Sequence, residues 1–183
     1  TTEIYTLSLH DALPISFLTK IKENGVYDDM VSRWIDKGMT EMPGLNISGV
    51  NGVLRVGIVS DIGLPFTVMQ NGKLAGFDIE LSMRFAESQG MTYEPVDIPF
   101  GSMIASLATN KIDFTTCSMM ITEEREKQVD FSDPYYESGV SLFALRSNIQ
   151  VPVSKKMNDA ADIAGKKVGD RKSTRLNSSH VSQ

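Results

Sequence analysis

The stretch ITEEREKQVDFSDPYY, from Ile121 to Tyr136, decides how the chain is interpreted, because it places an arginine in a short predicted helix. Thr122 has the side chain of a helix N-cap, and the two glutamates after it put negative charge at the positive end of the helix dipole. The guanidinium of Arg125 presents a rigid fork of donors that suits a carboxylate with two parallel hydrogen bonds. The alternative is a surface arginine that pairs with Glu124 or Glu126.

From Leu54 onward, apolar runs rich in β-branched residues alternate with segments that have helical spacing. Asn71 and Gly72 form the turn signal of a β-hairpin. The expected strands are 54–60, 66–69, 73–75, 92–98, 112–116 and 140–145, and the expected helices are 77–89, 102–109 and 122–128. This alternation predicts an α/β fold with a mostly parallel sheet flanked by helices. Ligands of such sheets bind beyond the carboxyl ends of the strands, where Asp61 and Ser118 are expected.

Before this α/β region, two amphipathic helices are expected between Phe17 and Gly38, with a turn at Asn24 and Gly25. Trp34, in the second helix, is expected to pack inward. Residues 39–53 are rich in Gly, Pro, Asn and Ser and lack apolar periodicity, so they are expected to form a linker.

Composition excludes several classes of function. The chain has 18 basic and 23 acidic residues, a formal net charge of −5, whereas a nucleic-acid partner requires a basic face. The two histidines, His10 and His180, lie near the termini, and Cys117 is the single cysteine, so neither histidine catalysis nor a Cys/His zinc site is expected. No apolar run approaches the ~20 residues of a membrane-spanning helix. No cofactor is expected.

Three segments occur in order: GFDIEL (76–81), SLATNKID (106–113) and MITEEREKQVDFSDPYYESG (120–139). Together they resemble the first lobe of the bacterial extracellular solute-binding proteins of family 3, over residues 54 to about 169. The third segment is the most specific, because it matches in register along its whole length. The resemblance implies the first lobe of a two-lobed, periplasmic-binding-protein-like clamp at 54–146. It also implies a truncated second lobe that starts at 147–169.

The resemblance implies a ligand site at seven positions that match ligand-contacting residues of the family. These are Asp61, Leu64, Phe100, Cys117, Ser118, Met120 and Arg125.

Each position has an implied role. Arg125 matches the carboxylate-binding arginine, and Cys117 and Ser118 match small residues whose backbone and hydroxyl groups face that carboxylate. Met120 stands where many members carry a hydroxyl, which removes a contact of roughly 1.5–3 kcal/mol.

The remaining positions depart from the family pattern or have simpler explanations. Leu64 lies nearest to an aromatic platform that has no clear counterpart in this sequence. Asp61 alternatively caps its own turn, and Phe100 alternatively packs in the core. Tyr135 and Tyr136 are expected to be packing residues near the hinge rather than catalytic ones.

The two terminal segments resemble translated DNA adapters rather than natural protein sequence. Residues 1–16 and 170–183 resemble translated sequencing adapters and are left out of the fold prediction. Residues 17–38 resemble the end of a family-3 domain, so they are expected to be the tail of a preceding binding domain. A helical N-terminal extension and an assembly chimera are the alternatives. The chain is therefore expected to be a piece of a longer gene product.

These expectations combine into a function. The chain is expected to be a non-enzymatic, extracytoplasmic or periplasmic domain, free or attached to the membrane. It would capture a small carboxylate-bearing solute, an amino acid, for the permease of an ABC importer. The alternatives are a ligand-sensing domain of a tandem-clamp membrane sensor and a dehydratase on the same fold.

Overall fold

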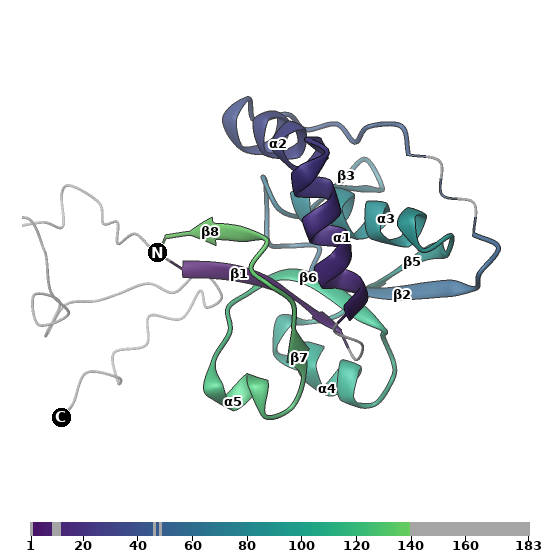
Figure 1. Ribbon diagram of the computed structural model, residues 1–183, viewed down its shortest axis with the longest axis vertical. Coiled ribbons are helices and arrows are strands. Elements are labelled where there is room, and N and C mark those ends of the chain that lie inside the picture. The colour runs from purple at the N-terminus through teal and green to yellow at the C-terminus, as the bar shows by residue number, and fades with distance from the viewer. Residues whose placement is uncertain (1, 9–11, 46, 48, 140–183) are drawn as a thin grey trace, which may run out of the picture. The chain divides into compact units, whose positions relative to one another are not determined.

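The computed structural model describes residues 2–8, 12–45, 47 and 49–139 (Figure 1). The chain divides into two units, 1–140 and 141–183, and all described residues lie in the first. The expected strand at 140–145, the expected second-lobe start at 147–169 and residues 170–183 lie outside the described residues. Within these limits, no helix is long and apolar enough to cross a membrane.

A six-stranded sheet forms the centre of the first unit. Its strands are β1 (Thr2–Ser8), β2 (Val53–Ile58), β5 (Thr92–Asp97), β6 (Phe114–Met119), β7 (Asp130–Phe131) and β8 (Tyr136–Ser138). The order along the sheet is β5-β2-β6-β1-β7, and β8 pairs with β1. Strands β5, β2 and β6 are parallel, whereas β1 is antiparallel to β6, β7 and β8. The predicted α/β fold built on a parallel sheet is confirmed.

Strand β1 lies within the segment that resembles an adapter sequence. Its backbone pairs with β6 on one side, where Leu7 lies opposite Thr115, and with β8 on the other, where Ile4 lies opposite Tyr136. In the described part of the chain, β7 and β8 join the sheet through β1. The adapter origin of residues 1–16 stays a prediction that the source DNA would test.

Helices cover both faces of the sheet. They are α1 (Ala12–Glu23), α2 (Val26–Val31) with a π-helical turn η1 (Ser32–Asp36), α3 (Phe77–Ser88), a 3-10 turn η2 (Phe100–Ser102) followed by α4 (Met103–Ala108), and α5 (Glu123–Glu126). Figure 1 shows α1, α2 and α3 on one side of the sheet and α4 and α5 on the other. The predicted break at Asn24 and Gly25 is confirmed, since Gly25 has a φ of 79° between α1 and α2.

The hairpin expected around Asn71 and Gly72 is confirmed. It consists of β3 (Val68–Gln70) and β4 (Lys73–Ala75), and the two turn residues have φ values of 51° and 75°. Positive φ at both positions is what a two-residue hairpin turn requires.

Two predictions about element ends are wrong. The strand expected at 112–116 runs from Phe114 to Met119, because the residues before it still close the end of α4: the Lys111 and Ile112 amides donate to Ser106 O. The helix expected at 102–109 is shorter at both ends: α4 runs from Met103 to Ala108, with Met103, Ser106 and Leu107 buried and Ala108 exposed.

Two apolar clusters fill the space between the sheet and its helices. The larger joins α1, α2 and α3 to the sheet and includes Leu18, Trp34, Phe77 and Phe85. The smaller lies on the α4 side and includes Met103, Leu107, Cys117 and Met119. The prediction that Trp34 packs inward is confirmed, because its side chain is 1% exposed.

A buried carboxylate fixes α1, α2 and η1, which together we call the helical segment, to α3. Glu80, whose side chain is 0% exposed, accepts two hydrogen bonds from Arg33 at 2.9 and 2.7 Å and one from Trp34 Nε1 at 2.6 Å. Arg84 Nε donates a further bond at 2.8 Å. Burial alone would raise the pKa of Glu80, but the bonds from Arg33, Trp34 and Arg84 outweigh it and hold the pKa below its usual value. We call these four residues the Glu80 cluster.

Candidate functional site

The carboxyl ends of β5, β2 and β6 meet at one edge of the sheet, because the three strands are parallel neighbours. The loop with Asp61 follows β2, and Phe100 begins the turn η2 that follows β5. The first two loops are tied together, since Ser60 donates to the Asp97 carboxylate from its amide at 3.2 Å and its hydroxyl at 2.6 Å. This edge therefore collects three of the loops that carry the predicted site residues.

Arg125 lies over this edge. Thr122 caps α5, accepting from the Arg125 amide at its side-chain oxygen, and Arg125 sits in the single turn of that helix. The side chain turns back toward β6, where Nη1 donates to Met120 O at 2.6 Å. Its guanidinium carbon lies 5.7 Å from the centroid of the Phe100 ring, within the range of a cation–π contact. The structure thus brings Arg125, Phe100 and Met120 together.

The alternative role for Arg125, pairing with a glutamate of its own helix, has no support in the geometry. In the described ranges, the ion pairs involve Arg33, Arg55 and Arg84. Arg125 instead bonds a neutral carbonyl, so its charge is not neutralised by a carboxylate of the described chain. An uncompensated guanidinium beside an aromatic ring is suited to binding an anionic group.

The side chains of Cys117 and Ser118 point to opposite faces of the sheet. The Cys117 side chain is 0% exposed and packs in the smaller cluster. Contact between Cys117 and a ligand at the sheet edge would therefore involve its backbone. Ser118 faces α3, where its hydroxyl donates to Asp78 Oδ2 at 3.0 Å.

Asp78, Tyr135 and Ser118 form a buried hydrogen-bond network. Of these three residues, only Ser118 was predicted from the sequence to belong to the site. The Tyr135 hydroxyl donates to Asp78 Oδ1 at 2.8 Å, and the Ser118 amide donates to the same hydroxyl at 3.3 Å. Burial raises the pKa of Asp78 to about 6, although the bonds from Tyr135 and Ser118 act in the opposite direction. The expectation that Tyr135 is a packing residue is consistent with its full burial.

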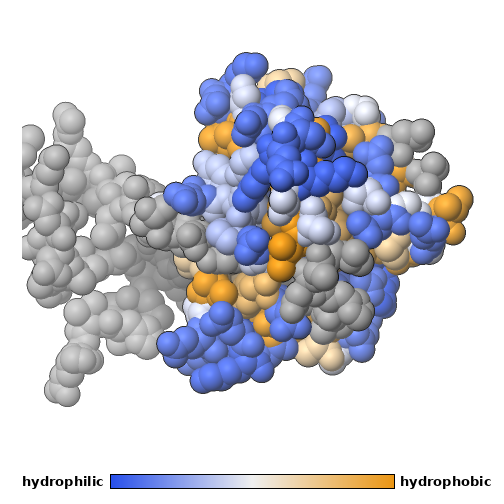
Figure 2. Space-filling view, in the orientation of Figure 1, coloured by the Kyte–Doolittle hydropathy of each residue, from blue (hydrophilic) through white to orange (hydrophobic). Residues whose placement is uncertain are grey.

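The other predicted positions are on the surface. Leu64 and Met120 are 41% and 44% exposed, and Asp61 is also exposed. Figure 2 shows a hydrophilic surface over α5 with apolar side chains reaching the surface next to it. The site edge thus combines the Arg125 guanidinium, the Phe100 ring and the exposed apolar side chains of Leu64 and Met120.

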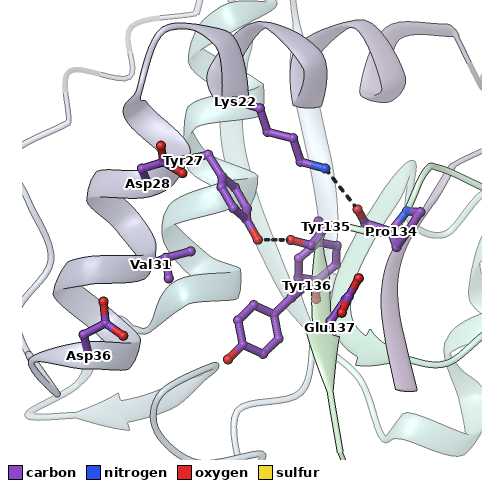
Figure 3. Close-up of a pocket in the computed structure, with 9 residues that line it drawn as sticks. All are labelled: Lys22, Tyr27, Asp28, Val31, Asp36, Pro134, Tyr135, Tyr136 and Glu137. Atoms are coloured by element: carbon purple, nitrogen blue, oxygen red, sulfur yellow. Dashed lines mark hydrogen bonds between the residues drawn. The ribbon is translucent and has the colours of Figure 1, made fainter. Parts of the chain in front are cut away.

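A separate cavity of about 630 Å³ lies between the helical segment and β8 (Figure 3). It is lined by Lys22, Tyr27, Asp28, Val31, Asp36, Pro134, Tyr135, Tyr136 and Glu137. None of the seven predicted site residues lines it. In the described part of the chain, no group of His, Cys, Asp and Glu side chains could hold a metal ion.

The raised pKa of Asp78 predicts how stability depends on pH. Its folded value of about 6 lies above the ordinary value of 3.8, so the stabilisation that comes from protonating Asp78 is complete below about pH 4 and is lost as the pH rises through 6. Two pKa units correspond to about 3 kcal/mol. We expect the free energy of unfolding of the native chain, minus that of Asp78→Asn, to fall by about 2–3 kcal/mol between pH 4 and pH 7.

Urea denaturation of both proteins at four pH values would measure this difference. Glu80 and Asp113, whose pKa values are lowered, are present in both proteins. Their contributions to the pH dependence therefore cancel when the two free energies of unfolding are subtracted. A difference that stays constant across the range would show that Asp78 does not titrate in this way.

The structure thus places the Arg125 guanidinium at the carboxyl edge of three parallel strands that are flanked by helices. The chain belongs to the bacterial extracellular solute-binding proteins, family 3, whose family model matches residues 54–175. The resemblance seen in the sequence is therefore confirmed.

Several curated relatives are similar over part of their length. A probable histidine-binding protein of Campylobacter jejuni is 32% identical over 130 residues, 71% of this chain and 48% of the relative. The L-cystine-binding protein TcyJ of Escherichia coli K12 is 31% identical over 140 residues, which cover 76% of this chain and 48% of the relative. The arginine-binding extracellular protein ArtP of Bacillus subtilis is 35% identical over 108 residues, which cover 57% of this chain and 38% of the relative. The chain thus spans about half of these relatives or less.

Solved structures are also similar. The arginine-bound form of a truncated arginine-binding protein from T. maritima is 44% identical, with a TM-score of 0.45 over 46% of this chain and 40% of that one. An arginine-bound domain 1 of TmArgBP is 40% identical, with a TM-score of 0.46 over 51% and 74%.

Proposed function

We propose that residues 54–146 form the first lobe of an extracytoplasmic binding protein that captures an amino acid and delivers it to the permease of an ABC importer. The observation that carries this proposal is the arginine at the sheet edge. Arg125 lies against Phe100, bonds a backbone carbonyl and forms no ion pair with any carboxylate of the described ranges. The names of the family and of its relatives support binding rather than catalysis.

The geometry supports a carboxylate as the group that Arg125 binds. One hydrogen bond to Met120 O and one ring contact with Phe100 hold the guanidinium at this edge, and its other N–H groups make no hydrogen bond within the described part of the chain. A pre-oriented fork of this kind can donate two parallel bonds to a carboxylate. Closure of a second lobe would exclude water and strengthen the pair.

Ser118 contributes differently from what its position in the sequence suggested. Its hydroxyl hydrogen is donated to Asp78 and its amide is directed at Tyr135, so both donors of Ser118 are used inside the lobe. In this geometry the Ser118 oxygen is left to accept a hydrogen bond. Carboxylate binding in our proposal therefore rests on Arg125.

A basic amino acid is the first solute to test. Relatives bear names that specify arginine, histidine and cystine. The exposed Asp61 carboxylate lies on a loop at the same edge and suits a cationic side chain.

Calorimetry with a panel of amino acids tests the proposal. The protein to use is the reading frame extended to the length of the relatives, because the 183-residue chain spans about half of them. We expect micromolar binding of at least one of arginine, histidine and cystine. The 183-residue chain alone should bind at least about 100-fold more weakly, since it would supply only part of the contacts. Absence of binding by the extended protein to any amino acid would refute the proposal, and micromolar binding by the 183-residue chain would contradict the second expectation.

A further inference from the structure

A buried carboxylate without a cationic partner lies directly under the end of β6. Asp78 is 0% exposed and is absent from the ion pairs of the described residues. Its carboxylate instead accepts two hydroxyl bonds, from Tyr135 at 2.8 Å and from Ser118 at 3.0 Å. Burying a carboxylate with only neutral partners is unfavourable, so this arrangement is not explained by stability.

The network holds an unusual backbone conformation. Ser118 has a φ of 51°, in the left-handed region that residues with a β-carbon seldom adopt. Its hydroxyl bond to Asp78 and its amide bond to Tyr135 fix the residue from both sides. Ser118 lies one residue before the end of β6, where the pairing with β1 shifts register, and two residues before Met120, whose carbonyl accepts a hydrogen bond from Arg125.

The same network reaches the segment where the described chain leaves the lobe. Tyr135 immediately precedes β8, and its ring stacks on Phe77 with centroids 6.2 Å apart and planes 15° apart. Figure 3 shows its carbonyl accepting a hydrogen bond from the Tyr27 hydroxyl, at 2.5 Å. Tyr135 is therefore held by α2, α3 and β6 at once.

We propose that Asp78 is a positioning residue of the candidate site, which acts through Ser118 and Tyr135 to hold the end of β6, and with it Arg125, in the geometry that a ligand needs. The inference rests on the proposed function. It assigns a role in binding to a residue that does not touch the ligand.

The first measurement is made without ligand. In NMR spectra of the 183-residue chain, the Ser118 amide should titrate with a midpoint near pH 6, the value to which burial raises the pKa of Asp78. The titratable groups around Asp78 do not interfere, because burial raises the pKa of Tyr93 to about 12 and that of Tyr135 well above its usual value. The Ser118 titration should disappear in Asp78→Asn.

The second measurement is arginine affinity in the extended protein. We expect Asp78→Asn and Tyr135→Phe each to weaken binding about tenfold. Thr116→Val is a matched control: Thr116 is on the same strand and donates to Asp78 O at 2.9 Å, but it does not contact the carboxylate. This variant should lose stability, keep the Ser118 titration and bind within about twofold of the native protein.

The outcomes separate the inference from the proposed function. If the native protein binds and both network variants bind equally well, the positioning role is wrong. If no amino acid binds to the native protein, the proposed function fails, and the Ser118 titration alone decides whether Asp78 positions the end of β6. If Asp78→Asn does not fold, Tyr135→Phe decides, because it keeps the ring and its packing.

Discussion

Replacing Arg125 with alanine should weaken amino-acid binding by the extended protein by about 2–5 kcal/mol, the usual cost of truncating one partner of a desolvated charge pair. This corresponds to a loss of affinity between about 30-fold and several thousand-fold. The expectation follows from the position of the guanidinium, which contacts Met120 O and the Phe100 ring but no carboxylate of the described chain. Isothermal titration calorimetry with the best-bound amino acid would measure the change.

Two further variants make this test specific. Lys127→Ala removes an exposed cation at the C-cap of the same short helix and should change affinity less than about threefold. Arg125→Lys keeps the charge but loses the fork, so it should fall between the native protein and the alanine variant. Unchanged affinity in Arg125→Ala would remove this residue from the site. The stability of all three variants should stay close to native, because neither side chain is in a described ion pair.

Local sequence signals predicted the elements that depend on local chemistry. Asn71 and Gly72 fixed the hairpin, and Thr122 fixed the start of α5, since each needs only its immediate neighbours. Arg125 was singled out by the resemblance of the segment around it, because its local chemistry also allowed a surface arginine that pairs with a glutamate. Its contact with Phe100 could only be inferred from resemblance, because the two residues come from loops after different strands.

The alternation of side chains along β6 explains a limit of the sequence prediction. Cys117 and Ser118 matched positions whose backbone and hydroxyl groups face the ligand carboxylate, and the structure places their side chains on opposite sides of the sheet. Cys117 packs into the apolar cluster on the α4 side, whereas Ser118 faces Asp78. A predicted strand boundary at residue 116 obscured this, because the strand continues to Met119.

Asp78 was not predicted from the sequence as a buried residue of the site, because the sequence does not show what surrounds α3. A polar residue in an amphipathic helix is expected to face solvent. Helix α3 instead lies between the sheet and the helical segment, and it buries Asp78 and Glu80 as well as its apolar stripe. The signal available in the sequence was that both carboxylates fall within GFDIEL, one of the three family segments.

Replacing Glu80 with glutamine should lower the free energy of unfolding by about 3–5 kcal/mol, because it leaves two arginines and an indole N–H around a neutral group. The carboxylate is fully buried and accepts four hydrogen bonds from Arg33, Trp34 and Arg84, and an amide nitrogen in its place cannot accept. Asp29→Asn is the matched control, since Asp29 pairs with the same Arg33 at 2.8 Å but its side chain is 61% exposed. The control should cost at most about 1 kcal/mol.

Urea denaturation of the 183-residue chain, followed by Trp34 fluorescence, measures both costs with a probe that lies in the Glu80 cluster itself. The comparison tests whether the helical segment and the α/β lobe unfold together as one cooperative unit. If it docks as the structure shows, Glu80→Gln should lose the Trp34 signal and the α/β lobe in one transition, because the segment and α3 share one apolar cluster. If Glu80→Gln costs no more than Asp29→Asn, the segment does not depend on this carboxylate. That result would favour the prediction that residues 17–38 are the tail of a preceding domain over the alternative that they are an integral part of this lobe.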